Sequence, residues 1–328
     1  MTHLESAHIR VVKPGWFTTV QDVGRYGYQQ FGVSSSGPMD RRSFILANRL
    51  VGNRDDKAAL EFTLQGPELL FKQDSIVALT GADLTPFVDG RAIPLWTSIL
   101  LKAGSTLIFG TRRAGARCYL AIAGGIDVPM VMGSRSTHIA SQIGGMKGRG
   151  LAQGDVLIAG TPFSRQRDMI GREVPEQMRP LYSTVATLRI LKGPQQSSFS
   201  EQALDVLTTS PYRLSSQSDR MGYRLEGPRL TYAGARERIS DATAMGALQV
   251  PPDEQPILLM ADRQTTGGYP KIAVVISVDL HLAGQLLPGD AINFRLTTQA
   301  EALAAMKAEW SGLDRALPPY RGHPASGR

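Results

Sequence analysis

The fold class is decided by four short runs within residues 59–125, namely ALEFTL (59–64), SIVALTG (75–81), STLIFG (105–110) and RCYLAIAGG (117–125). Each run is rich in residues that favour strands and is bounded by Gly, Pro or Asp, which is typical of β-strands joined by turns. The second half repeats this texture in QPILLMAD (255–262), KIAVVISV (271–278) and GDAINFRL (289–296). With 34 glycines and 20 prolines among 328 residues, the chain is predicted to be mainly β with a few short helices.

Three segments carry helical signals instead. Residues 39–50 (MDRRSFILANRL) offer Asp40 as an N-cap and an apolar stripe that stops before Gly52. A short helix is predicted within residues 197–210 (SSFSEQALDVLTTS), and a tail helix over residues 299–310 (QAEALAAMKAEW). Residues 311–328 are expected to be flexible.

Matching segments in the two halves indicate an internal duplication. In the same order, TLQGPEL (63–69) matches RLEGPRL (224–230), AGGIDVPMVMGS (123–134) matches TGGYPKIAVVIS (266–277), and LAQGDVLI (151–158) matches LLPGDAIN (286–293). Such weak repeats predict duplicated β units. We therefore expect an N-terminal β subdomain (9–160, with one helix near 40–50), a linker (161–182), a C-terminal β subdomain (183–298), and a C-terminal helix with a flexible tail (299–328).

Charge and reactive residues narrow the function classes. The net charge of +7 favours anionic ligands, but the basic residues form only short pairs, so nucleic-acid binding is not supported. The lone Cys118 excludes an internal disulfide framework, and the five histidines lack metal-binding spacing, so no metal site is expected. No apolar stretch approaches about 20 residues. The N-terminus does not read as a signal peptide, so a cytoplasmic protein without membrane contact is expected.

The chain lacks the sequence motifs expected of an enzyme that is active without partner subunits. The glycine loop at 145–150 lacks the Walker order of a phosphate-binding loop, and GVSSSG (32–37) does not match the serine-hydrolase elbow. The sequence also shows no carrier-lysine motif for biotin. No tightly bound cofactor is therefore expected on this chain.

Two polar segments are candidates for ligand-facing loops. Residues 18–40 place Gln21, Asp22, Arg25 and Asp40 among glycines, the polar density that a binding loop on a rigid scaffold needs. Turn chemistry and a helix cap are the alternative explanation. Residues 215–228 place Asp219 beside Arg220, which form either part of a site or a surface ion pair of little energy. Substrate-binding roles are predicted for all six residues.

The strongest candidate lies in residues 250–271. QPILLMAD predicts a buried strand that ends at Asp262, and a polar segment with two glycines follows it. An amide or ureido ligand needs an acceptor for its N–H, such as Asp262, and a donor for its C=O, such as Arg263 or Lys271. These three residues are predicted to be catalytic, and a polar hairpin turn is the alternative. The predicted substrate-binding members are Gln264, Thr265, Thr266, Gly267, Gly268 and Tyr269.

An ordered set of short motifs gives these segments a family context. From about Val11 to about Leu296 the chain contains TTVQDVGRYGY, GPMD, ANRLVGN, ALE, LTGAD, YLAIAGGIDVP, MGSRST, SDRMGYRLEGP and LMADRQTTGGYPKIA. In this order they resemble the KipA-like family of biotin-dependent carboxyltransferase-like proteins, also called allophanate hydrolase subunit 2. Each motif is weak alone, whereas the ordered set is highly specific.

The resemblance implies a fold, partners and a reaction. It implies two cyclophilin-like β-barrel subdomains, a KipI-like partner of the allophanate hydrolase subunit 1 type, and a theme of –CO–NH– chemistry. Family members include a subunit of the ATP-dependent 5-oxoprolinase, which opens 5-oxo-L-proline to L-glutamate with a LamB/YcsF-type subunit. The free-standing length favours this role, with ATP and magnesium used by the whole complex and little activity expected alone. The alternatives are a carboxyltransferase component of a biotin-dependent urea carboxylase and a KipA-type regulatory binding protein.

Overall fold

The N-terminal half consists of two β-sheets that enclose a common core. The computed structural model describes residues 8–161, 166–234 and 240–319. The six-stranded sheet has the order β11 (Val156–Ile158), β1 (His8–Lys13), β4 (Glu68–Phe71), β9 (Thr106–Phe109), β6 (Pro86–Val88) and β7 (Arg91–Ala92). The five-stranded sheet has the order β2 (Phe17–Gln21), β3 (Ala59–Thr63), β10 (Ala114–Ile122), β5 (Ser75–Asp83) and β8 (Ser98–Leu101). Buried aliphatic and aromatic side chains from both sheets form one cluster between them.

The C-terminal half is a closed barrel. Its strands follow the order β12 (Val185–Lys192), β19 (Lys271–Val275), β16 (Ala247–Gln249), β17 (Ile257–Leu259), β14 (Gly222–Glu226), β13 (Tyr212–Leu214) and β20 (Ala291–Leu296). The parallel pairing of β12 with β20 closes the ring, and a second core fills it. A separate two-stranded sheet joins β15 (Asp241–Ala242) to β18 (Thr266–Gly267). The mainly β class is confirmed; the closed barrel lies in this half, whereas the N-terminal strands divide between two sheets.

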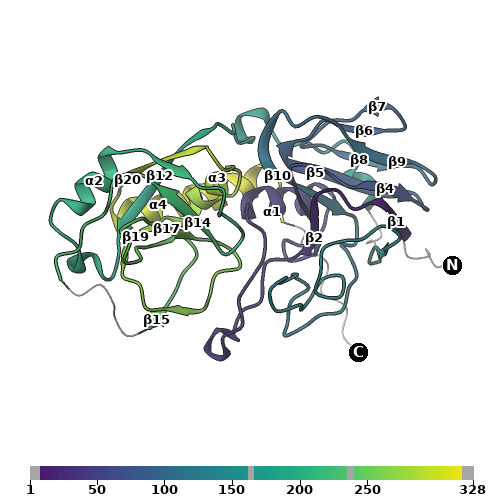
Figure 1. The fold of residues 1–328 in the computed structure, drawn as a ribbon. Helices are drawn as coiled ribbons and strands as arrows, with labels where there is room; N and C mark the ends of the chain where they lie inside the picture. Colours follow the sequence, from purple (N-terminus) through teal and green to yellow (C-terminus); the bar gives the residue numbers. More distant parts are fainter. Residues whose placement is uncertain (1–7, 162–165, 235–239, 320–328) are drawn as a thin grey trace, which may run out of the picture.

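Helices cover the outside and the junction of the two halves. The α-helices are α1 (Arg41–Leu50), α2 (Ala203–Thr209), α3 (Leu280–Ala283) and α4 (Gln299–Ala316). Short 3-10 turns occur at η1 (Gln29–Phe31), η2 (Gln166–Met169), η3 (Glu176–Met178), η4 (Gln196–Ser198) and η5 (Ser277–Asp279). Asp40 caps α1 as predicted, because its carboxylate accepts from the Ser43 backbone N–H at 2.9 Å. Figure 1 shows α1 and α3 between the two halves.

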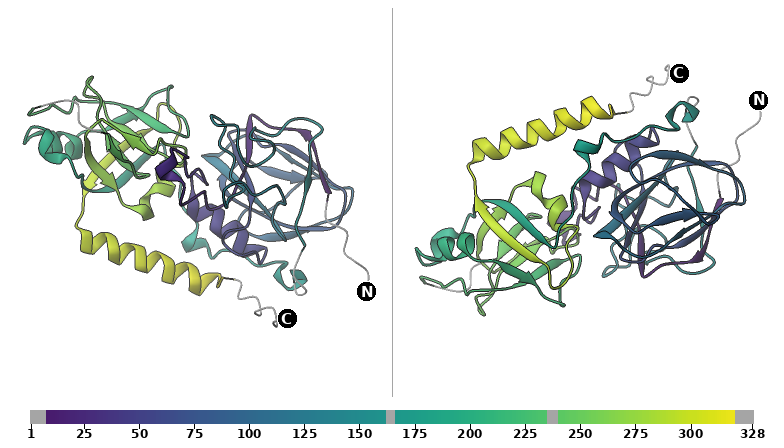
Figure 2. Two further views of the ribbon diagram at one scale, coloured as in Figure 1. Left: turned by 90° about the horizontal axis from the view of Figure 1, so that it is seen from below. Right: turned by 90° about the horizontal axis from the view of Figure 1, so that it is seen from above.

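The C-terminal helix is longer than the sequence predicted. Helix α4 continues to Ala316, because Leu313 is buried in the cluster beneath α1 and Arg49 binds both the Asp314 carboxylate and the Leu317 carbonyl. Figure 2 shows α4 running from the barrel towards the N-terminal half. The rest of the predicted flexible tail, residues 320–328, lies outside the described residues.

The two halves pack closely against each other along an interface that we call the seam. Met39, which precedes α1, is packed into the barrel core. Gly284 follows α3, and a side-chain carbon placed on it would lie 2.4 Å from the Met39 carbonyl oxygen. Only glycine permits this approach of the two backbones. The segment predicted as a linker, in its described part, lies beside the start of β8, where Ser98 N donates to Arg172 O at 2.9 Å.

Candidate functional site

A pocket of about 440 Å³ opens at the seam between the halves. Its N-terminal walls come from β2, β3, β10 and the loop after β10, and its C-terminal wall comes from the loops that precede β14 and follow β17. We call it the seam pocket; it is lined by Trp16, Phe17, Thr63, Leu64, Arg117, His138, Ile139, Ala140, Asp219, Arg220, Met221 and Asp262. Its size and mixed lining suit a small molecule with a few polar groups.

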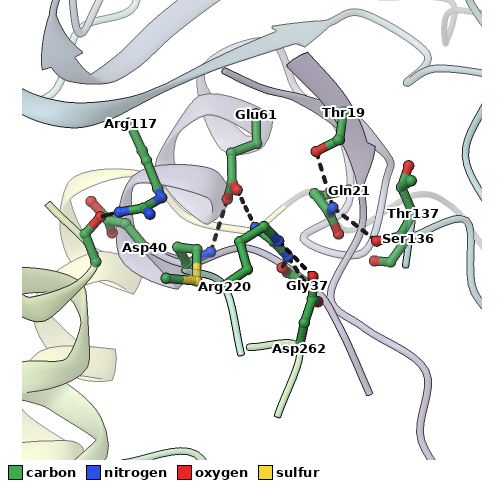
Figure 3. Close-up of polar contacts among 12 residues, drawn as sticks. Thr19, Gln21, Gly37, Asp40, Glu61, Arg117, Ser136, Thr137, Arg220 and Asp262 are labelled. Atoms are coloured by element: carbon green, nitrogen blue, oxygen red, sulfur yellow. Dashed lines mark hydrogen bonds and ion pairs between the residues drawn. The ribbon is translucent and has the colours of Figure 1, made fainter. Parts of the chain in front are cut away.

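Arg220 is the central cation of the seam. Its guanidinium donates to Asp262 through Nε (2.8 Å) and Nη2 (3.2 Å), to the Gly37 carbonyl at 2.6 Å, and to Glu61 through Nη1. Figure 3 shows Arg220 between Glu61 and Asp262. Burial opposes the charge of this guanidinium, but the Asp262 and Glu61 carboxylates more than offset it, so the pKa of Arg220 is raised. The residue therefore stays charged and ties the two halves together.

Glu61 extends this network into the five-stranded sheet. Its second oxygen accepts from the Met39 backbone N–H at 2.8 Å and from the Tyr119 hydroxyl at 2.7 Å. Burial, with the nearby Glu61 and Asp40 carboxylates, raises the pKa of Tyr119, so its hydroxyl remains a donor. Glu61 is 1% exposed, and its charge is balanced by Arg220 across the seam.

Asp40 has a structural part in the same region. Its Oδ2 accepts from the Ser43 hydroxyl at 2.6 Å, from Tyr182 at 3.1 Å and from Gln285 of the C-terminal half at 2.8 Å. The Gln285 amide oxygen in turn accepts from two backbone N–H groups of β10. Asp40 is therefore occupied as a helix cap and a bridge between the halves.

The other predicted residues of the 18–40 loop lie beneath the loop that follows β10. Asp22 accepts from the Ser134 and Ser136 hydroxyls, and Gln21 donates to the Thr137 carbonyl at 3.2 Å. Arg25 is fully buried and donates to backbone carbonyls of that loop. Burial lowers its pKa, against the opposing pull of nearby carboxylates. These side chains hold one loop to the other and are not part of the seam-pocket lining.

The 262–271 segment is divided by the structure. Asp262 lines the seam pocket, whereas Arg263 points its Nη1 to the Ser35 hydroxyl (3.4 Å) and the Met260 carbonyl (3.4 Å). Burial lowers the pKa of Arg263. Lys271, on β19, is 3% exposed and donates to the Asp241 carboxylate at 3.1 Å and the Ala242 carbonyl at 3.0 Å. Among the lining residues of the pocket, Asp262 is the member of this trio that is present.

The remaining residues of the segment build a small lobe beside the barrel. The Gln264 amide donates to Gln249 at 3.0 Å, and the Thr265 carbonyl accepts from the Thr243 backbone N–H. Thr266 and Gly267 form β18, Gly268 follows it half-buried, and Tyr269 is 41% exposed. This lobe lies at the lower edge of Figure 1, around β15.

Three residues that were not among the predicted site residues belong to the seam. Arg117 lines the pocket and donates through Nη1 to the Tyr223 hydroxyl at 2.8 Å and the Gly284 carbonyl at 2.5 Å. His138 also lines it, and its Nδ1 accepts from the Ser141 backbone N–H at 3.3 Å. Glu61 balances Arg220. A charged residue inside an apolar strand run, as in ALEFTL and RCYLAIAGG, was the available sequence signal.

Metal-ligand clusters and membrane-spanning helices are both absent from the described part of the chain. Within 8–161, 166–234 and 240–319, no three His, Cys, Asp or Glu side chains gather as metal ligands would. In the same ranges, no helix is both long and apolar enough to cross a bilayer.

Comparison with known proteins identifies the family. Residues 31–296 match the model of the carboxyltransferase domain, subdomain A and B. The chain belongs to this carboxyltransferase-domain family. The resemblance read from the sequence motifs is thereby confirmed.

Relatives within the family differ in size. The chain is 42% identical to a 5-oxoprolinase subunit of Escherichia coli over 90% of this chain and 94% of the relative. It is 36% identical to the corresponding 5-oxoprolinase subunit of Haemophilus influenzae, over 87% of this chain and 89% of the relative. The solved urea carboxylase of Kluyveromyces lactis superposes on 99% of this chain with a TM-score of 0.89 and 30% identity, but the match spans 30% of that larger chain.

Proposed function

We propose that this chain is a subunit of an ATP-dependent 5-oxoprolinase, which converts 5-oxo-L-proline to L-glutamate. The observation that carries the proposal is the 42% identity to the 5-oxoprolinase subunit of Escherichia coli, which extends over 94% of that relative. The proposed partners are a KipI-like subunit and a LamB/YcsF-type subunit. ATP with magnesium is used by the assembled complex, and the chain alone is expected to be inactive.

The seam pocket is the proposed site where the complex binds the –CO–NH– group of its substrate. Each carboxylate oxygen of Asp262 accepts one hydrogen bond from Arg220 and keeps a further lone pair that can accept a ligand N–H. Because His138 Nδ1 accepts a backbone N–H, the ring nitrogen assigned as the donor is Nε2. That N–H is available to a ligand carbonyl, so one wall offers an acceptor and another a donor.

Within this proposal, Asp262 is the residue that contacts the lactam N–H. Arg263 and Lys271 do not contact the ligand in this proposal; they stabilise the backbone on either side of the 264–269 lobe through the contacts described above. A donor to the carbonyl oxygen polarises the amide carbon towards attack, whereas the acceptor at the N–H orients the ring. The hydrolytic chemistry itself is assigned to the complete complex.

Reconstitution tests this function directly. The chain should be co-purified with its KipI-like and LamB/YcsF-type partners and assayed for glutamate formed from 5-oxoproline with and without ATP. Glutamate release that requires ATP and all three subunits supports the proposal. Absence of release from the assembled complex would sink it.

A second candidate is the carboxyltransferase role in a biotin-dependent urea carboxylase system. It is favoured by the close superposition on the Kluyveromyces lactis urea carboxylase. This role needs biotin carried by another protein and a urea-like acceptor. Saturable binding of biotin or urea by the complex, together with no binding of 5-oxoproline, would replace the first proposal with this one.

A further inference from the structure

Arg117 and Arg220 both lie at the seam, but Arg220 binds carboxylates and Arg117 does not. It is 7% exposed, and its two acceptors, the Tyr223 hydroxyl and the Gly284 carbonyl, are both neutral. Among described residues, no carboxylate lies within salt-bridge distance of its guanidinium. Glu61 and Asp262, the acids of the seam network, are already engaged by Arg220. A buried guanidinium without an anion is unfavourable.

The unpaired part of Arg117 is one complete edge of its guanidinium. Nε is buried and has no hydrogen-bond partner, and no described residue accepts from Nη2. Nε and Nη2 form the side of the fork whose spacing fits the two oxygens of a carboxylate. Buried polar groups normally find partners, and Arg117 lines the seam pocket, so an external partner for this edge would have to reach it from the pocket.

Other arginines of this chain show what this edge binds. Arg49 holds Asp55 through Nε and Nη2, both at 2.8 Å. Arg189 holds Asp279 through Nε at 2.9 Å and Nη2 at 2.6 Å. Arg220 uses the same two atoms for Asp262. In Arg117 this edge has no carboxylate, and the residue lines the seam pocket.

The rest of the pocket limits the kind of carboxylate. Trp16, Leu64, Ile139 and Met221 supply apolar surface along its walls. A cavity of about 440 Å³ takes a small ring and excludes a polymer. The lining therefore fits a compact, partly apolar molecule that carries one carboxylate.

We propose that the seam pocket binds a small carboxylate-bearing molecule and that Arg117 receives the carboxylate on its Nε–Nη2 edge. Under the proposed function, on which the identity of the ligand rests, this group is the carboxylate of 5-oxo-L-proline. Arg117 is then the residue that distinguishes this lactam from neutral lactams and from urea. Its role is specificity in binding and not bond cleavage.

Ligand analogues test this without altering the protein. Binding to the assembled complex should be measured by calorimetry for 5-oxo-L-proline, for 2-pyrrolidone (the lactam without the carboxylate) and for cyclopentanecarboxylate (the carboxylate without the lactam). We expect 5-oxo-L-proline to bind at least about tenfold more tightly than 2-pyrrolidone, since a charge-assisted bidentate pair is lost in the latter. Equal affinity for the two lactams would overturn the proposal.

Variants then assign the effect to Arg117. Arg117→Lys keeps the charge but loses the fork, and should weaken 5-oxo-L-proline binding at least about tenfold while leaving 2-pyrrolidone binding unchanged. Arg113→Lys, at an exposed arginine whose side chain is 74% accessible, is the matched control and should leave both affinities unchanged. An Arg117→Lys complex that assembles and keeps full preference for the carboxylate would refute the assignment.

The outcomes separate this inference from the proposed function. A complex that prefers both carboxylates through Arg117 but releases no glutamate keeps the Arg117 assignment and removes the 5-oxoprolinase role. A complex that releases glutamate from 5-oxoproline but binds 2-pyrrolidone equally well keeps the role and removes the assignment.

Discussion

Replacing Arg220 by methionine tests the buried ion-pair network that joins the two halves. Methionine occupies the space of the aliphatic stem but removes every donor of the guanidinium. The variant leaves Glu61 (1% exposed) and Asp262 (6% exposed) without their common cation. It also leaves the Gly37 carbonyl without its donor.

The expected loss follows from these contacts. Removing one partner of a buried ion pair costs about 3–5 kcal/mol, because an uncompensated charge stays buried. Arg220→Met leaves two such carboxylates, so the free energy of unfolding should fall by at least about 3–5 kcal/mol. Glu61→Gln leaves Arg220 paired with Asp262, so its loss should be smaller, about 1.5–3 kcal/mol, the range of one hydrogen bond to a charged group.

Urea denaturation of both variants at pH 7 and pH 5 provides the assay. The pKa of Arg220 is raised above the already high pKa of arginine in the unfolded state. The stabilising effect of its charge is therefore fully present below that unfolded-state pKa and is constant between pH 5 and pH 7. The Arg220→Met variant, in contrast, gains stability as pH falls, because the carboxylates left buried without a cation can take up protons in the folded state. A loss below about 1 kcal/mol, the scale of an exposed pair, would refute the reasoning. The reasoning would also be refuted if the loss of unfolding free energy in Arg220→Met were as large at pH 5 as at pH 7.

Three further predictions concern the barrel, the C-terminal helix and a surface turn. Lys271→Met should lower the melting temperature and leave kcat/KM of the folded complex unchanged; a large fall in kcat/KM with intact stability would make Lys271 catalytic instead. Leu313→Ala should lower the free energy of unfolding by about 2–5 kcal/mol in urea titrations, whereas Leu303→Ala, exposed on the same helix, should change it by less than about 0.5 kcal/mol. The hydrogen bond from Arg149, opposed by partial burial, holds the pKa of Asp155 below its usual value, so this stability is present above the unfolded-state pKa and lost as pH falls. Asp155→Asn should therefore lose about 0.5–1 kcal/mol at pH 7, after allowing for solvent screening, and progressively less as pH falls below the unfolded-state pKa of about 3.9; a pH-independent loss would contradict this.

Local patterns in the sequence were sufficient for much of the fold. The strand texture, the Asp40 cap and the start of the tail helix depend on neighbours within a few residues, and all three are present in the structure. The extension of α4 to Ala316 was missed because it depends on burial of Leu313 against α1, far away in the chain. Tertiary packing of this kind leaves no local signature.

The site was less predictable for the same reason. Asp262 and Arg220 were both singled out, but their pairing with each other and with Glu61 spans sequence separations of 42 and 159 residues. Lys271 is close to Asp262 in sequence, yet it donates to Asp241 and Ala242 beside a different strand. Arg117 could be recognised only as a charge in an apolar run, and its vacant edge is visible only in three dimensions.

The most direct test of the proposed site is to fill the seam pocket. Ala140 is an exposed lining residue, so Ala140→Trp places an indole in the cavity without disturbing a core. Ala304→Trp, exposed on α4, is the matched control. ATP-dependent glutamate release should be measured for both complexes after co-purification shows that all subunits are present. We predict that Ala140→Trp lowers kcat/KM for 5-oxoproline at least about tenfold while the control matches the unmodified complex. An assembled Ala140→Trp complex with unchanged kcat/KM would show that the substrate is bound elsewhere.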